Sequence, residues 1–273
     1  MKVYISVDME GIAGVSHSHT TDPKDARYPV SVDLMIGETN AAIEGALAGG
    51  ATEVLVNDSH SSMFNLLPED VDPRATVLLG QKAWSMVAGA QDGFDVALFV
   101  GYHARAGHPR GTIAHTYSGL PAETRLDGRP TGEYGLNALV LGAWGIPVGL
   151  VTGDDALAEE VVDWLPWAER VVVKRAHGGR SAASVHPSRA RELVREGAER
   201  AVRRAAAGEL ENLVVAAPVA IEVDYAKGVL ADHAAIVPGA VRVGDRTVRF
   251  EFDDAVSTFR AFLAANRLAE AVG

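Results

Sequence analysis

We predict an α/β fold from this sequence: a three-layer α/β/α arrangement around a mostly parallel sheet, followed by a smaller C-terminal α+β portion. Short, nearly continuous apolar segments rich in β-branched residues recur along the first 180 residues. Stretches with the apolar spacing of helices separate several of these segments. Strands that are apolar on both faces and alternate with helices are typical of a parallel sheet covered on both sides.

The individual elements of this sheet follow from local patterns. Residues 31–50 have apolar residues at helical spacing and end in Gly-Gly, which predicts a helix between the first two strands. Asp154 and Asp155 follow a strand and predict the N-cap and the acidic first turn of another helix. The predicted strands are residues 2–9, 52–58, 75–80, 95–103, 147–155 and 169–175.

The composition of the chain changes after about residue 180. Residues 186–211 predict one long helix rich in Arg, Glu and Ala, with a proline near its start. A strand is expected within residues 212–223, a hairpin around a Gly-Asp pair within residues 235–254, and a last helix over residues 255–272. We therefore predict a first domain over residues 1–180 and a smaller α+β portion over residues 181–273, packed on it without a clear linker.

Composition and charge limit the classes of function. A net charge of −11 and an isoelectric point near 5.3 lack the basic footprint of sequence-independent nucleic-acid binding, so no nucleic-acid partner is expected. No apolar run reaches the roughly 18 residues of a membrane span, and the N-terminus lacks the pattern of a secretory signal. We therefore expect no membrane association and a cytoplasmic location. The chain has no cysteine, so oxygen and nitrogen atoms must hold any metal.

Polar side chains follow three of the predicted strands. Asp8 and Glu10 end the first strand two positions apart, so their carboxylates are expected on one face, where they repel unless a cation lies between them. His60 follows the second strand, and His103 ends the fourth. The carboxyl ends of parallel strands line one crevice, so these side chains are expected to converge. Two carboxylates and two imidazoles favour zinc, with Mn²⁺ or Co²⁺ as alternatives.

Two more residues extend this hypothesis. Glu133 lies in the first turn of a predicted helix, where the helix dipole alone would favour a carboxylate. Asp8 could bridge two ions about 3.5 to 4 Å apart, as in two-metal hydrolases. His115 follows on a loop or short strand and could act as an acid or base or stabilise a transition state. Taken singly, each residue also has an ordinary explanation as a turn, cap or buried structural residue.

A glycine-rich segment after residue 175 is a weaker candidate site. Lys174 and Arg180 flank Gly178-Gly179, and a turn into a helix there could hold an anion or a carboxylate. The sequence has no G-x-G-x-x-G after a strand, no Walker loop and no G-x-S-x-G motif.

Five motifs in register resemble those of the zinc-dependent D-aminopeptidases, a family first named dipeptide transport protein. The likeness covers most of residues 1 to about 185 and thins toward the C-terminus. The motifs are, in chain order, SVDMEG, EVLVNDSH, ALFVGYHAR, TIAHTYSG and RPTGEYGLNA.

This resemblance implies a ligand set, an assembly and a reaction. His115 matches the catalytic residue, and the family forms a ring-shaped homo-oligomer, a decamer, that encloses the active sites. The implied reaction removes an N-terminal D-amino acid, typically D-alanine, from short peptides by a dizinc-activated water. The implied metal ligands, with Asp8 shared between two zinc ions, are Asp8, Glu10, His60, His103 and Glu133. The metal-binding catalytic domain would then be residues 1–180.

The chemistry of these residues agrees with that reaction. His115 would stabilise the tetrahedral oxyanion or protonate the leaving amine. Asp58 or Asn137 would orient the ligands. Two other functions stay open: another metal-dependent amidase or phosphoesterase, and a non-catalytic dipeptide-binding or transport component. A binding component would need neither the converging acids nor the histidines.

Overall fold

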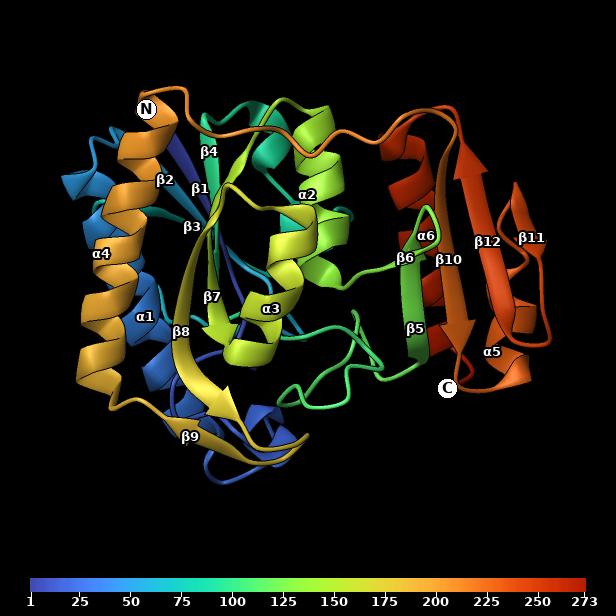
Figure 1. Cartoon of the computed structure of the whole chain (residues 1–273). Helices are drawn as coiled ribbons and strands as arrows, with labels where there is room; N and C mark the ends of the chain where they lie inside the picture. The colour runs from blue at the N-terminus through green and yellow to red at the C-terminus, as the bar shows by residue number, and fades with distance from the viewer.

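A seven-stranded sheet forms the centre of the larger part of the molecule (Figure 1). The computed structural model describes residues 1–273. The strand order is β3-β2-β1-β4-β7-β8-β9, and every neighbouring pair is parallel except β8 and β9. The strands are β1 (Lys2–Val7), β2 (Glu53–Asp58), β3 (Thr76–Leu78), β4 (Val96–Val100), β7 (Val148–Asp154), β8 (Glu169–Ala176) and β9 (Ala182–Ser184).

Helices cover both faces of this sheet, so the predicted three-layer α/β/α arrangement is confirmed (Figure 1). Val3, Ile5 and Val7 of β1 pack with α1 and α4 in one hydrophobic cluster, whereas Tyr4 belongs to a second cluster on the α2 and α3 side. This alternation follows from the two-residue period of a strand. The helices are α1 (Tyr28–Ala48), α2 (Glu133–Ala143), α3 (Asp155–Trp164) and α4 (Pro187–Ala206).

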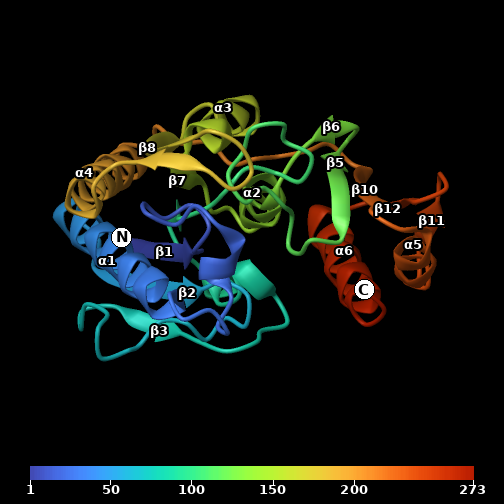
Figure 2. The same cartoon turned by 90° about the horizontal axis from the view of Figure 1, so that it is seen from below.

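A second sheet of five antiparallel strands lies beside the first, in the order β11-β12-β10-β5-β6. Helix α6 packs on this sheet and also against α2, so it stands between the two parts (Figure 2). No helix of the chain combines the length and the apolar composition needed to cross a membrane. The elements are β5 (Pro121–Leu126), β6 (Arg129–Pro130), β10 (Val219–Tyr225), α5 (Gly228–Ala234), β11 (Ala240–Arg242), β12 (Thr247–Phe252) and α6 (Ala255–Glu270).

The two sheets do not divide the chain at residue 180. Helix α4 follows that position but packs against α1 and the main sheet. Strands β5 and β6 precede it but belong to the second sheet. One hydrophobic cluster contains Leu139 of α2, Phe250 of β12 and Phe262 of α6. Because the chain enters the second sheet twice and the core is continuous, no single point separates the sheets, and the division at residue 180 stays a prediction.

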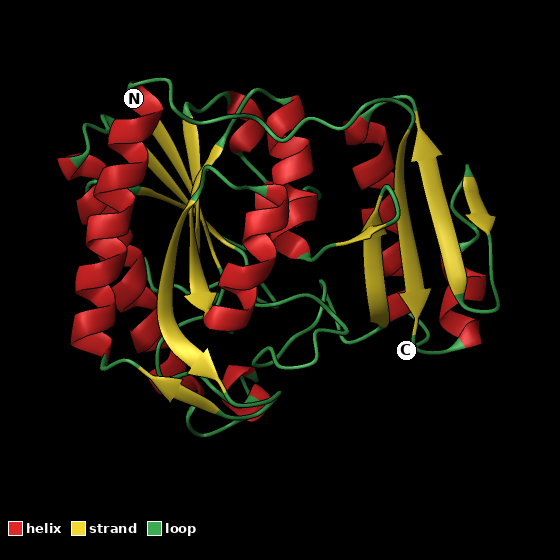
Figure 3. Cartoon of the chain, in the orientation of Figure 1, coloured by secondary structure: helices red, strands yellow, loops and turns green.

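Three local expectations also differ from the structure. Strand β1 ends at Val7, so Asp8 and Glu10 lie in the turn beyond it. Gly178-Gly179 leads into β9 and not into a helix. Residues 212–218 form no strand, and β10 begins directly after Pro218, which has no N–H for a ladder hydrogen bond. Figure 3 shows loops gathered at the carboxyl end of the main sheet. The short 3₁₀ helix η1 (Ser18–Thr21) follows β1, and η2 (Ser85–Val87) and η3 (Ala90–Asp92) lie in the connection from β3 to β4.

Candidate metal centre

The six predicted site residues come together at this carboxyl end. Asp8 and Glu10 follow β1, His60 follows β2 and His103 follows β4. Because β1 pairs in parallel with both β2 and β4, its two neighbours end at the same level and their loops meet. The set is completed by Glu133, the first residue of α2, and by His115 in the loop between β4 and β5.

Two glycines let the loops after β1 and β4 approach closely. The Gly11 N–H donates to the Gly101 carbonyl over 2.7 Å, beyond the last strand hydrogen bonds. A Cβ on Gly11 would lie 1.9 Å from the Tyr102 carbonyl oxygen. Gly101 has φ +71°, and a Cβ there would lie 2.2 Å from the carbonyl oxygen of Asp8. These glycines of the MEG and VGYH motifs therefore bring the two sets of ligands together.

The carboxylate of Asp8 lies between two imidazoles. Its Oδ1 is 3.2 Å from His60 Nδ1, and its Oδ2 is 3.4 Å from His103 Nε2. Glu10 Oε2 is 3.0 Å from the same nitrogen of His60, and Glu133 Oε2 is 3.3 Å from that of His103. The five side chains thus form two groups, Asp8 with Glu10 and His60, and Asp8 with Glu133 and His103.

Backbone carbonyls fix the tautomers of both imidazoles. His60 Nε2 lies 3.0 Å from the Thr21 carbonyl, and His103 Nδ1 lies 3.0 Å from the Ala104 carbonyl. Since a carbonyl oxygen only accepts, each of these nitrogens carries a proton. In the neutral ring the other nitrogen, which faces the carboxylates, therefore carries a free lone pair. His103 Nε2 is buried and makes no hydrogen bond.

The electrostatics of the buried cluster favour a cation at its centre. Burial raises the pKa of Asp8, but the facing imidazoles of His103 and His60 outweigh this effect and hold the pKa well below its usual range. Burial lowers the pKa of His60 and of His103, but the facing carboxylates, Glu10 and Glu133 foremost, raise both well above the ordinary value. The same positions that attract protons would attract a divalent metal ion, which displaces those protons on binding.

The residues present fit a zinc centre. All five are buried, and their donor atoms are oxygen and imidazole nitrogen. Two ligand atoms on one tetrahedral zinc ion lie about 3.4 Å apart, because each lies about 2.1 Å from the metal. The separations of 3.0 to 3.4 Å within the two groups agree with this spacing.

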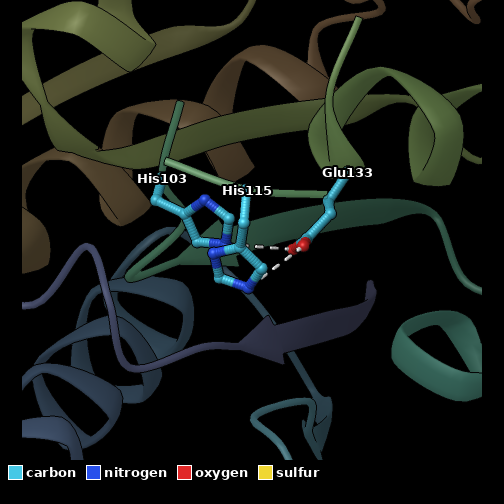
Figure 4. Close-up of side chains that lie close together, drawn as sticks. All are labelled: His103, His115 and Glu133. Carbon is cyan, nitrogen blue, oxygen red and sulfur yellow. Dashed lines mark ion pairs between the residues drawn. The ribbon is translucent and has the colours of Figure 1, made fainter. Parts of the chain in front are cut away.

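His115 differs from the five buried residues. Its side chain is 26% exposed, against 3% for Glu133, and its Nε2 lies 3.8 Å from Glu133 Oε1. The ring stacks on that of His103 at a centroid distance of 4.1 Å (Figure 4). Ligand atoms of His103, His115 and Glu133 lie within 4.8 Å of one another, so His115 is within reach of the metal position. Its exposure places it where a substrate can also reach it.

A cavity of about 440 Å³ opens beside the cluster. Asp8, Glu10, His60, His115 and Glu133 line one side of it. Side chains of α6 that the sequence did not assign to the site line another side: Leu263, Asn266, Arg267 and Glu270. Their spacing of three and four residues is the signal of one helical face, but nothing in the sequence indicated that this face would meet the strand ends.

Residues around the ligands hold the loops in place. The Lys174 ammonium is buried and donates to the carbonyls of Glu10, Ile12 and Val15. It therefore does not hold an anion, contrary to the expectation from the sequence. Asp58 accepts from the backbone of Asn65 and Leu66 and thereby anchors the loop after His60.

Asn137 is linked to the predicted ligand Glu133 through Tyr117. Its Oδ1 accepts from the Tyr117 hydroxyl, and the Tyr117 N–H donates to Glu133 Oε1. The predicted orienting residues therefore act on loops and on Glu133 rather than on the imidazoles. Arg180 lines a neighbouring hollow that also contains Glu10 and His115.

A family model described as D-aminopeptidase matches residues 1–264. The chain belongs to the D-aminopeptidase family. The D-aminopeptidase of Bacillus subtilis (strain 168) is 35% identical to it over 271 residues, which is 98% of both chains. A solved structure of the Zn-dependent D-aminopeptidase DppA from Bacillus subtilis, described as a self-compartmentalizing protease, matches with a TM-score of 0.93 at 34% identity. The match covers 100% of this chain and 99% of that one.

Membership in the D-aminopeptidase family confirms the family predicted from the five motifs. It also confirms the predicted class of enzyme, a peptidase that removes an N-terminal residue. The likeness extends over the C-terminal part, where the sequence motifs thin out, because the fold match covers the whole chain.

Proposed function

We propose that this D-aminopeptidase family member removes an N-terminal D-amino acid, such as D-alanine, from short peptides. In this proposal Asp8, Glu10, His60, His103 and Glu133 hold two zinc ions, with Asp8 shared between them. The observation that carries it is the position of Asp8, whose two carboxylate oxygens face two different imidazoles at 3.2 and 3.4 Å. The solved relative is described as Zn-dependent, which supports zinc as the metal. Mn²⁺ and Co²⁺ would suit the same donors.

Bound zinc would supply a Lewis acid and would lower the pKa of a bound water from about 15.7 to about 7. The carboxylates of Asp8, Glu10 and Glu133 would carry the compensating negative charge at this buried site. Outside the ligand set, Asp22 and Glu270 also line the cavity and favour a substrate with a free amine.

His115 serves as the proton donor and acceptor of the reaction. Its Nδ1 lies 2.8 Å from the Ile113 carbonyl, so this nitrogen carries a proton and Nε2 faces Glu133 and the cavity. Held in this orientation, Nε2 of the neutral ring can accept a proton from the attacking water. The protonated ring can then donate to the developing oxyanion and pass the proton to the leaving amine.

The assembly is part of the same proposal. The related structure is described as a self-compartmentalizing protease, and we propose that this chain likewise forms a homo-oligomeric ring, a decamer by its family resemblance. Exposed apolar side chains near the edge strand β11, among them Ile236, Val241 and Val243, support a contact between subunits. Sedimentation velocity would test the size. A cytoplasmic location remains a prediction from the sequence.

Metal analysis combined with a peptide panel tests the function. We expect near-stoichiometric zinc, up to two ions per subunit, and cleavage of D-Ala-D-Ala but not of L-Ala-L-Ala. Protein without a transition metal would contradict the enzyme proposal. Protein with metal that leaves D-peptides intact but cleaves another amide or a phosphoester would identify a different metallohydrolase.

A further inference from the structure

One face of α6 lines the cavity that holds the proposed metal ligands. Leu263, Asn266, Arg267 and Glu270 recur at spacings of three, one and three residues, which places them on one side of the helix. Tyr117, two residues after His115, packs edge-on against Phe262 of the same helix at a centroid distance of 5.2 Å. This contact ties the α6 face to the loop that carries His115.

Arg267 is the only Lys or Arg among the twenty residues that line this cavity. The other charged residues of the lining are carboxylates, Asp8, Glu10, Asp22, Glu133 and Glu270, together with two histidines. Zinc ions held by Asp8, Glu10 and Glu133 would offset the charges of these three carboxylates. Away from the metal, the lining has the acids Asp22 and Glu270 and one place that attracts a negatively charged group of a ligand. That place is the guanidinium of Arg267.

The guanidinium of Arg267 has donors to spare. Its Nη1 donates to Glu270 Oε2 over 3.1 Å, and neither Nε nor Nη2 donates to another protein group, in a side chain that is 55% exposed. A guanidinium binds a carboxylate through two parallel N–H groups, which these two nitrogens can provide while Glu270 keeps the third. Arg267 also borders the next hollow, which is lined by Lys82 and Arg260, so this end of the cavity is its basic end.

The neighbouring Asn266 has an unmatched polar atom. Its side chain lines the cavity and is buried, with 3% of its surface exposed. Its Nδ2 donates to the Phe262 carbonyl, whereas its Oδ1 has no hydrogen-bond partner. The free Oδ1 of Asn266 beside Arg267 suits a peptide substrate, because the backbone N–H next to the terminal carboxylate of a peptide can donate to it.

We infer that Arg267 binds the C-terminal carboxylate of the substrate, so that the enzyme selects short peptides with a free C-terminus. This inference rests on the proposed function, since the metal ligands at the other side of the cavity would then receive the N-terminal residue. Peptide length is limited because both ends of the substrate must be bound within one cavity of about 440 Å³. Arg267 is thereby a substrate-binding residue that determines specificity.

The test compares D-Ala-D-Ala with its C-terminal amide, D-Ala-D-Ala-NH₂, in the zinc-loaded wild type and in Arg267→Ala. We expect the wild type to prefer the free acid about 10-fold to 100-fold in kcat/KM, chiefly through KM, which is the range of one charge-assisted interaction. In Arg267→Ala the kcat/KM for the acid falls by that factor, while the value for the amide stays the same. Arg267→Lys keeps part of the preference.

Arg260→Ala is the matched control, because Arg260 lies on the same helix but does not line the cavity of the metal ligands. It should keep the wild-type preference. A wild type that cleaves acid and amide equally well would overturn the carboxylate inference and leave the aminopeptidase proposal intact. A wild type that cleaves neither would refute the proposed function itself. Equal losses on both substrates in Arg267→Ala, with zinc content and assembly unchanged, would also overturn the inference.

Discussion

In the proposed metal centre, protons and metal ions would compete for the same positions around Asp8. The nitrogens of His60 and His103 that face the Asp8 carboxylate have a free lone pair only when the rings are neutral. The neighbouring acids raise the pKa of both rings well above the ordinary value in the absence of metal. Metal binding must therefore release protons, and the zinc affinity of the site falls as the pH is lowered.

His60 and His115 should respond differently to removal of the imidazole. In His60→Ala we expect loss of both metal and turnover, because His60 Nδ1 lies 3.0 to 3.2 Å from two proposed ligand carboxylates. In His115→Ala we expect turnover to fall about 100-fold or more with metal retained, because His115 is the proposed acid and base. Metal content by mass spectrometry and turnover of D-Ala-D-Ala would be measured on the same samples. Equal metal loss in the two variants would contradict this division of roles.

At the scale of elements, β8 and α1 hold the turn that carries the first two ligands. Lys174 of β8 donates to three carbonyls of the segment from Glu10 to Val15. Glu38 of α1 accepts from the Ala13 N–H over 2.8 Å. The segment has little regular structure of its own, so its shape depends on these two buried charged side chains.

Lys174→Met should weaken the metal site without unfolding the protein. The methionine side chain fills much of the same space but donates no hydrogen bond to the Glu10 carbonyl, so Glu10 loses its orientation. We expect the zinc dissociation constant to rise about 10-fold to 100-fold, which is usual for loss of a residue that supports a ligand. Competition with a chromophoric chelator measures it. Arg175→Met, at the exposed neighbouring position, serves as control and should bind zinc like the wild type.

Glu38→Gln should change how stability depends on pH. Burial raises the pKa of Glu38 to about 7, from an ordinary value of 4.5. The folded protein therefore keeps a proton that the unfolded chain releases between these values, and stability falls as the pH rises through that range. The variant lacks this loss. Its free energy of unfolding, taken relative to that of the wild type, should therefore be roughly 2 kcal/mol higher at pH 8 than at pH 5. Denaturant unfolding at both pH values measures the difference, and a constant difference would refute the explanation.

At the scale of the whole molecule, the proposed ligands connect three strands and a helix. Without a cation, three carboxylates and two imidazoles are buried together. In the proposed centre zinc would bind the folded chain through all of them, whereas the unfolded chain offers no such arrangement.

Removal of the metal should therefore lower thermal stability. We expect a strong chelator to lower the Tm by roughly 10 °C. Free zinc at a thousandfold excess over its dissociation constant would stabilise the folded chain by about 4 kcal/mol, and the chelator removes this stabilisation. Added zinc should restore the original Tm, as followed by calorimetry. Calcium, which prefers more oxygen ligands, should not restore it. A Tm that is the same with and without chelator would contradict the proposed centre.

The sequence predicted the main sheet and the convergence of the polar residues that follow its strands because these signals are local, whereas the roles of the six site residues stay a prediction. Apolar runs mark the strands, and Asp8, His60 and His103 stand directly after them. The second sheet was harder to predict, since β5 and β6 come from residues 121–130 and β5 pairs with β10, about 100 residues later in the chain. The role of α6 depends on that pairing, so Asn266 and Arg267 could be recognised as cavity residues only in the folded chain.

The loop that carries His115 leaves the main sheet at β4 and enters the second sheet at β5. Its two ends are thus anchored in different parts of the molecule, and its middle packs on α6 through Tyr117. Any rotation of one part relative to the other would shift this histidine against Glu133, which is anchored in α2. In the proposed mechanism, the width of the cavity and the position of the proton-transfer group His115 would therefore change together.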